Sequence, residues 1–394
     1  DPASYFRRLR ALAAANRPQG APFYVVVEKI LAHHEALRES WEVAGTTGYE
    51  FTSLVNGLFV DPAGEKSLLD TYAEFIGEQA IFDDILREAK QYVVDHMLAG
   101  EVNVLSSELD RISERHWSTR DFTNERLHAA LREVVVQFPV YRTYVTEAST
   151  TAEDLRDIDW AVNRARRRWR GPDPEIFDFV RAALTTELAR PPSPHRRAEI
   201  TRFAMRFQQR TGPITAKALE DTTFYRYNML LSLNEVGGDP KQFATTVAAF
   251  HHANRQRAKA WPHSMLTTAT HDTKRGEDAR VRIDVLSEIP QEWRERVKRW
   301  ATLNRYLRRE LDDAPAPSAN DEYMFYQVLV GAWPASIEKL PDGPSEDLAS
   351  LVGRLQAFVV KAAREAKVTT SWDRPNEAYE EAFRAFVAGS LDTG

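Results

Sequence analysis

The chain has 394 residues and no cysteine, and its 52 lysine and arginine against 58 aspartate and glutamate residues leave a formal net charge of -6. So mild a charge argues against nucleic acid or an anionic membrane as the main partner. Without cysteine the chain has no disulfide and no thiolate metal ligand, which fits a reducing compartment. It begins at Asp1 with no basic and apolar leader, and no apolar stretch is long enough to span a bilayer. We therefore expect a cytoplasmic protein.

The first 60 residues read as consecutive strand and helix units. A short helix around Tyr5 ends where Pro18 and Gly20 break its pattern. The apolar run 23–27 then predicts a strand that ends at Glu28. Further along, the pattern predicts a crossover helix at 30–40 and a second strand with its exit at 41–51.

Between residues 63 and 260 the apolar side chains recur at helical spacing, as Leu68, Tyr72 and Phe75 do. So long a helical stretch between predicted strands indicates an insertion. Proline- and glycine-rich segments predict turns between its helices, at 170–174, 190–194 and 237–240.

The β-prone run 264–270 predicts a return to strand, and His271 and Asp272 follow it directly. Beyond it we expect helix at 277–311, a proline-rich loop at 312–318, and helix through residue 386 with one irregular stretch at 369–375.

Glu28 and Asp272 each follow a predicted strand. In a parallel barrel the side chains at the C-terminal ends of the strands point into one mouth, so we expect the two carboxylates to face one pocket. A catalytic carboxylate at the exit of one parallel strand and a His-Asp pair at the exit of another is the arrangement found in barrel glycosidases. The pattern alone is weak, because a short apolar run can also be a buried helix and acidic residues end many strands.

The sequence around these residues is more specific. In this order, its segments closely resemble those of the maltooligosyltrehalose synthases, intramolecular transglucosylases of the α-amylase superfamily (glycoside hydrolase family 13). The resemblance runs from Asp1 to Tyr379. The segments that carry it are 27–31, 46–51, 55–61, 212–217, 220–228, 233–240 and 270–275.

The resemblance implies an α/β fold, a partial (β/α)8 TIM barrel of the α-amylase type with a large helical insertion, dominated by helix. It assigns residues 1–60 to the barrel, 61–260 to the insertion, 261–285 to a barrel strand with the His-Asp motif, and 286–394 to a helical region before a last strand. The family's nucleophile lies on a strand before the segment that aligns with Asp1. We therefore expect the middle part of a longer enzyme, inactive alone.

The implied reaction converts the reducing-end α-1,4 linkage of a maltooligosaccharide to an α,α-1,1 linkage by retaining double displacement. The product would be maltooligosyltrehalose, an intermediate of trehalose biosynthesis. We expect no cofactor and no metal, and maltooligosyltrehalose trehalohydrolase is a possible functional partner. Two alternatives stay open: an α-amylase-like hydrolase, and a non-catalytic glucan-binding fragment.

Carried over residue by residue, the resemblance makes Glu28 the general acid/base. Asp272 would hold the sugar and stabilise the transition state, and His271 would hydrogen-bond the same sugar. Lys274 and Arg275 either donate to sugar hydroxyls or pair with Glu277 or Asp278. Alternating charges and rings suit a sugar subsite, although helix packing is the commoner use of such rings. These further candidates are Lys217, Glu220, Asp221, Tyr225 and Tyr227.

Three other patterns have ordinary interpretations. The arginine-rich run 164–170 is expected on a solvated helix face, because acidic residues lie nearby, namely Glu153, Asp154, Asp157 and Asp159. The histidines at 33–34 and 251–252 lack the spacing of a helical zinc site and are expected in helices with one ring exposed. Residues 237–240 form a turn and no nucleotide cradle.

Overall fold

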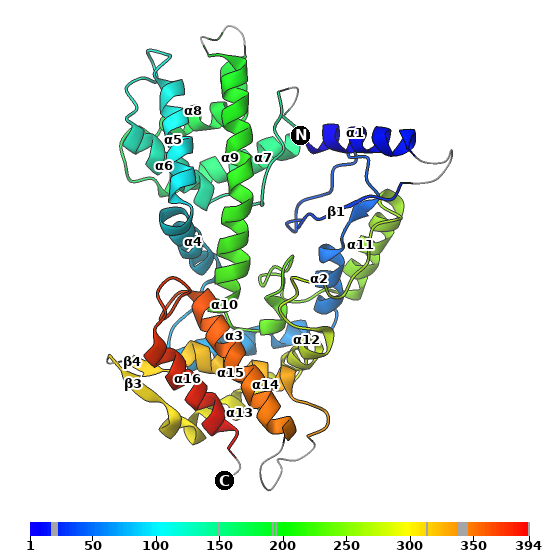
Figure 1. Cartoon of the computed structure of the whole chain (residues 1–394), viewed down its shortest axis with the longest axis vertical. Helices are drawn as coiled ribbons and strands as arrows, with labels where there is room; N and C mark the ends of the chain where they lie inside the picture. Colours follow the sequence, from blue (N-terminus) through cyan, green and yellow to red (C-terminus); the bar gives the residue numbers. More distant parts are fainter. Residues whose placement is uncertain are drawn as a thin grey trace. The chain divides into compact units, whose positions relative to one another are not determined.

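A computed structural model describes residues 1–16, 23–147, 150–190, 193, 195–312, 314–337 and 346–392. By their contacts they divide into two compact units, the first being Asp1–Thr46 with Leu86–Leu219 and the second Thr47–Ile85 with Glu220–Gly394. Both consist mainly of helices (Figure 1). None of the helices in the described ranges is long and apolar enough to cross a membrane.

Helices of the first unit begin where the sequence provides caps. The Asp1 carboxylate caps α1 (Pro2–Ala15) by accepting the Ala3 N–H at 3.1 Å. Thr151 and Asp154 form a reciprocal capping box at the start of α7 (Ala152–Arg168). The other helical elements of this unit are α4 (Phe82–Tyr92, which begins in the second unit), the π turn η2 (Val93–Met97), α5 (Ala99–Ser113), α6 (Asn124–Val136), α8 (Ile176–Leu184), η3 (Glu187–Ala189) and α9 (Arg197–Ala218).

The core of the first unit surrounds α9, with α5 and α8 packed against it (Figure 1). Fully buried side chains such as Leu131, Phe177 and Phe207 fill it. The predicted helical stretch and its turn at 170–174 are confirmed here. Pro18, Gly20 and most of the predicted turn 190–194 lie outside the described residues.

The strands of the first unit are very short. β1 (Val26–Val27) and β2 (Gly45–Thr46) run parallel, with Val26 opposite Gly45 and Val27 opposite Thr46. The predicted helix at 30–40 is wrong, because this segment has no helical turn. Arg38 and His34 pair with Asp154 and Asp157 of α7, and the Glu35 carboxylate accepts the Ala32 N–H at 3.3 Å, so local helix propensity is overridden.

The second unit has an aromatic core between α3 (Glu65–Ile76), α13 (Pro290–Leu303) and α14 (Ala319–Ala332). The Tyr72 and Tyr323 rings lie 5.1 Å apart, and Trp293 donates its indole N–H to the Tyr323 hydroxyl at 2.9 Å. The remaining elements are α2 (Tyr49–Gly57), η1 (Pro62–Gly64), the π turn η4 (Leu219–Thr223), α10 (Phe224–Arg226), η5 (Leu231–Leu233), α11 (Val247–Ala260), α12 (Glu277–Asp284), η6 (Val285–Ser287), η7 (Arg305–Leu307), β3 (Arg309–Leu311), β4 (Ala314–Ala316), α15 (Glu346–Ala366) and α16 (Glu377–Ser390).

Two predictions for the second unit are wrong. Residues 264–270 form no strand, and their carbonyl groups accept from side chains: the Thr52 hydroxyl donates to the Thr267 carbonyl at 2.8 Å. The predicted loop 312–318 contains β4, which pairs antiparallel with β3. The irregular stretch 369–375 is confirmed.

The strands in the described part of the chain form two two-stranded sheets. A helix-dominated molecule is therefore confirmed, and the barrel stays a prediction.

Candidate active site

Asp272 is held by a tyrosine of the second unit. The hydroxyl of Tyr49, the first residue of α2, donates to Asp272 Oδ2 at 2.8 Å. On the chain itself, the Asp272 N–H donates to the Thr270 hydroxyl at 3.2 Å, and His271 Nε2 lies 3.4 Å from Asp272 Oδ1. Tyr49 is 2% exposed, whereas the side chain of Asp272 is 42% exposed. A buried residue thus orients a carboxylate that remains accessible.

Two glycines explain how Tyr49 reaches this position. Gly48 has φ +97°, and a Cβ there would meet the Met265 carbonyl oxygen at 2.8 Å. Gly237 has φ +81°, and a Cβ there would lie 2.9 Å from the Tyr49 Cβ. Only glycine adopts such a backbone without strain while permitting so close an approach. The predicted turn 237–240 is therefore confirmed and packs behind Tyr49.

Behind the His-Asp motif lies a buried ion pair. Glu235 Oε1 is 3.4 Å from the Arg275 guanidinium, and Glu235 Oε2 accepts the Lys274 backbone N–H at 2.6 Å. Glu235 and Arg275 are both buried. The acid that Arg275 meets is therefore Glu235, and Glu277, one of the two partners considered in the alternative interpretation, accepts from the Thr268 hydroxyl at 2.8 Å.

Burial dominates the electrostatics of this pair. It raises the pKa of Glu235, although the neighbouring Arg275 and the Lys274 N–H act in the opposite direction. Burial likewise lowers the pKa of Lys274, opposed by Asp221 and Glu235. The Lys274 ammonium lies 4.5 Å from the ring centroid of Tyr225 and 3.5 Å from its hydroxyl. Lys274 is thus fixed against a ring and positioned to donate hydrogen bonds.

The predicted subsite residues occupy different environments. Tyr225 is buried beside Lys274, and burial raises its pKa to about 12. Tyr227 packs in the aromatic core, 5.4 Å from the Phe82 ring and 5.9 Å from the Tyr72 ring. Lys217, in the last turn of α9, is exposed. Their contact with sugar stays a prediction.

Glu220 and Asp221 lie in η4, and the Asp221 carbonyl accepts from the Lys367 ammonium at 2.9 Å. Single π turns of this kind occur frequently at functional sites.

A second layer of buried polar groups supports the motif. Arg280 on α12 donates to the Arg275 carbonyl at 2.7 Å and to the Asn56 side-chain oxygen at 3.1 Å. Asp284, one turn further along α12, is fully buried, and neither carboxylate oxygen has a well-formed hydrogen bond among the described residues. Burial raises the pKa of Asp284 to about 7, although Ser232, Arg280 and Asn56 act to lower it.

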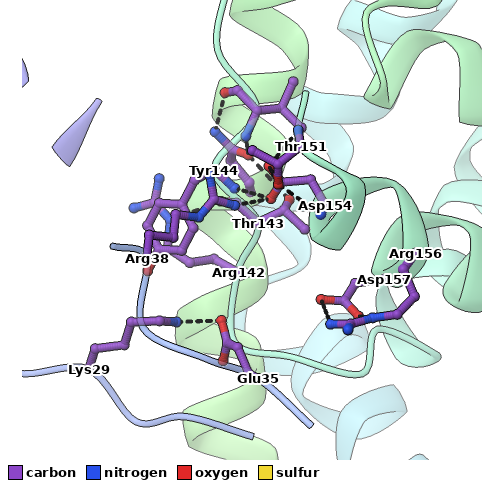
Figure 2. A network of polar contacts seen from close by, with 12 residues as sticks. Lys29, Glu35, Arg38, Arg142, Thr143, Tyr144, Thr151, Asp154, Arg156 and Asp157 are labelled. Carbon is purple, nitrogen blue, oxygen red and sulfur yellow. Dashed lines mark hydrogen bonds and ion pairs between the residues drawn. The ribbon is translucent and has the colours of Figure 1, made fainter. Parts of the chain in front are cut away.

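Glu28 belongs to the first unit, where it directly follows β1 and is exposed. The segment after it is tied by ion pairs: Lys29 meets Glu35 at 2.6 Å, and Arg38 meets Asp154 at 2.6 Å (Figure 2). Asp272 lies in the second unit. A pocket shared by the two carboxylates stays a prediction.

Other candidate segments are placed differently from expectation. Asp154 and Asp157 are buried and do not form a solvated face with the arginine run, whose Arg167 and Arg168 are exposed. Residues 33–35 lie in a turn, not a helix. The helix predicted around His251 and His252 is confirmed as α11, but both rings are exposed.

Sequence analysis did not single out Tyr49, Glu235 or Arg280. Tyr49 and Glu235 lie inside the segments that carry the family resemblance, and this position in the sequence could have marked them as candidates. Arg280 had none, because a helical arginine is usually solvent-exposed.

The chain is similar to enzymes of the maltooligosyltrehalose synthase kind in both sequence and structure. One relative is the putative maltooligosyl trehalose synthase of Mycobacterium tuberculosis H37Rv, which is 34% identical to this chain over 393 residues. The alignment covers 100% of this chain and 45% of that protein. The structure of maltooligosyltrehalose synthase from Arthrobacter ramosus matches with a TM-score of 0.78 and 34% identity, over 100% of this chain and 44% of that one. A hypothetical maltooligosyl trehalose synthase from Sulfolobus tokodaii matches with a TM-score of 0.74 and 28% identity, over 100% and 44% of the two chains.

No protein-family model matches the chain. It spans about 45% of the length of the curated relatives. The chain is therefore homologous to maltooligosyltrehalose synthases along its whole length, and the resemblance seen in its motifs is confirmed.

Proposed function

We propose that the protein containing this chain is an intramolecular transglucosylase that converts the reducing-end α-1,4 linkage of maltooligosaccharides to an α,α-1,1 linkage. The observation that carries the proposal is the homology over all of this chain to maltooligosyltrehalose synthases. The fixed orientation of Asp272 by Tyr49 supports it, because a preorganised carboxylate stabilises developing positive charge better than a mobile one.

In the proposed reaction Glu28 protonates the glycosidic oxygen while a carboxylate of the same enzyme attacks the anomeric carbon. The released glucose then turns within the pocket, and its anomeric hydroxyl attacks the glycosyl-enzyme with Glu28 as base. Asp272 and His271 hold the sugar at the reacting centre, and Lys274 donates to its hydroxyls. Water is the competing nucleophile, so a closed site separates isomerisation from hydrolysis.

The wider organisation belongs to the same proposal. Residues 1–60 and 261–285 would contribute to an α-amylase-type barrel, 61–260 would form its helical insertion, and 286–394 a helical region before a last strand. The proposal also includes a cytoplasmic location. A maltooligosyltrehalose trehalohydrolase would be the functional partner that consumes the product.

Product analysis on maltopentaose tests the function in the full-length protein. A non-reducing pentasaccharide supports isomerisation, whereas new reducing ends indicate a hydrolase. Binding without turnover would refute both and leave a glucan-binding protein.

Glu28→Gln in that protein should lower turnover by about 100-fold or more, because the amide keeps the shape but cannot transfer the proton. Substrate binding should persist, as measured by calorimetry with maltopentaose. Near-normal turnover would show that another residue supplies the proton.

A further inference from the structure

The segment that follows Glu28 has no regular structure of its own. Between residues 29 and 41 it is closed by turns, with the Glu35 N–H donating to the Ala32 carbonyl at 2.8 Å and the Trp41 N–H to the Arg38 carbonyl at 3.1 Å. A backbone with so little regular hydrogen bonding takes its conformation from side-chain contacts. The position of Glu28, at the start of this segment, therefore depends on what those side chains bind.

One contact closes the segment on itself. Lys29, the residue after Glu28, pairs with Glu35 at 2.6 Å, and both side chains are largely buried. The second Glu35 oxygen accepts the Ala32 N–H at 3.3 Å. The Lys29 ammonium also lies 5.0 Å from the ring centroid of Tyr144, which belongs to the segment between α6 and α7. Lys29 is thus held from within the segment and from outside it.

A second contact joins the segment to α7. Asp154 Oδ1 accepts from Arg38 at 2.6 Å and from the Tyr144 backbone N–H at 2.8 Å, while Oδ2 accepts from the Thr151 hydroxyl at 3.0 Å (Figure 2). Asp154 is 1% exposed. The Arg38 guanidinium in turn lies 4.8 Å from the Tyr144 ring centroid. One buried carboxylate therefore holds both Arg38 and the ring against which Arg38 and Lys29 pack.

A third contact repeats this arrangement one turn along α7. Asp157 is also buried, and its Oδ1 lies 3.2 Å from Nε2 of His34. Residues three apart on a helix lie on one face, so α7 presents two carboxylates to the same segment. Asp159 on this helix instead pairs with Arg181 of α8 at 2.6 Å. The same helix thus offers a control aspartate whose ion pair is with a different element.

We propose that Asp154, acting through Arg38 and Tyr144, is a positioning residue that sets the geometry of Glu28. This inference rests on the proposed function, in which Glu28 is the acid/base. Removing the charge of Asp154 leaves Arg38 without its carboxylate and weakens the hydrogen bond from the Tyr144 N–H, so the segment can move away from α7. A displacement of about 1 Å at a catalytic group can lower the rate by about 100-fold without weakening substrate binding.

The test compares Asp154→Asn and Asp159→Asn in the full-length protein. We expect Asp154→Asn to lower kcat on maltopentaose by about 10- to 100-fold with KM within about twofold, and to raise the share of hydrolysis. Amide exchange should rise in residues 29–41 and stay unchanged in α8. Asp159→Asn should leave kcat, KM and the product ratio at the parent values. Equal effects of the two substitutions would overturn the inference.

Arg38→Ala keeps the test decisive if Asp154→Asn does not fold. Millimolar guanidinium ion should restore at least about a tenth of the lost kcat by occupying the space beside Asp154, which a loss of stability alone would not allow. Absence of rescue, or an unchanged kcat in Arg38→Ala, would overturn the inference. The proposed function would still stand as long as the parent protein produces the isomer. A parent protein that produces no isomer overturns both.

Discussion

Asp284 should make the second unit less stable as the pH rises. The carboxyl group is fully buried, and burial raises its pKa from 3.8 to about 7. The folded state therefore binds a proton between about pH 4 and pH 7 that the unfolded state has released. Because the native state binds more protons in this window, the free energy of unfolding falls with rising pH until the native group has ionised.

The size of the effect follows from the two pKa values. At 1.36 kcal/mol per pH unit, the interval from 3.8 to about 7 corresponds to about 4 kcal/mol. About 2.5 kcal/mol of this falls between pH 5 and pH 8. This is an upper value, since Arg280 and nearby side chains can adjust once Asp284 is charged.

Asp284→Asn keeps the shape of the side chain but cannot ionise. Between pH 5 and pH 8 the free energy of unfolding of the parent should therefore fall by up to about 2.5 kcal/mol more than that of the variant. Urea denaturation followed by tryptophan fluorescence, to which Trp293 buried in the same unit contributes, provides the measurement. Asp278→Asn, on the exposed side of α12, is the control and should follow the parent. Parallel pH profiles for Asp284→Asn and the parent would refute the reasoning.

Two further substitutions test the supports of the candidate site by denaturation. Glu235→Ala should lower the free energy of unfolding by about 3–5 kcal/mol, because Arg275 is left buried without its carboxylate; a loss below about 1 kcal/mol would contradict this. Gly48→Ala should cost roughly 2 kcal/mol or more, because φ is +97° and the new Cβ would meet the Met265 carbonyl at 2.8 Å. Gly353→Ala in α15 is the control, because no atom lies within 4 Å of the new Cβ, and it should be neutral or stabilise by up to about 1 kcal/mol. Equal losses of stability at the two glycines would refute the steric argument.

Much of the helical architecture could be predicted because its signals are local. A helix places apolar residues on one face at a period that is visible in the sequence, and Leu68, Tyr72 and Phe75 show it in α3. The glycines at 237–238 likewise predict their turn, because the backbone conformation is a property of the residue itself. The family resemblance also depends on sequence alone, and it led to Asp272 before any contact was known.

Residues 30–40 and 264–270 show where local signals fail. Both have the composition of regular elements, yet neither forms one, because partners distant in the sequence bind their polar groups. Asp154 holds Arg38 across 116 positions, and Thr52 binds the Thr267 carbonyl across 215. A short segment has too few hydrogen bonds of its own to resist such contacts.

The same distinction applies to the candidate site. That a carboxylate follows each of two short segments, and that the chain resembles the maltooligosyltrehalose synthases, could be read from the order of the residues. That Tyr49 orients Asp272 and that Glu235 pairs with Arg275 became visible only in the folded chain. Side-chain partners of this kind depend on which backbones approach in space, and no periodicity in the sequence records that approach.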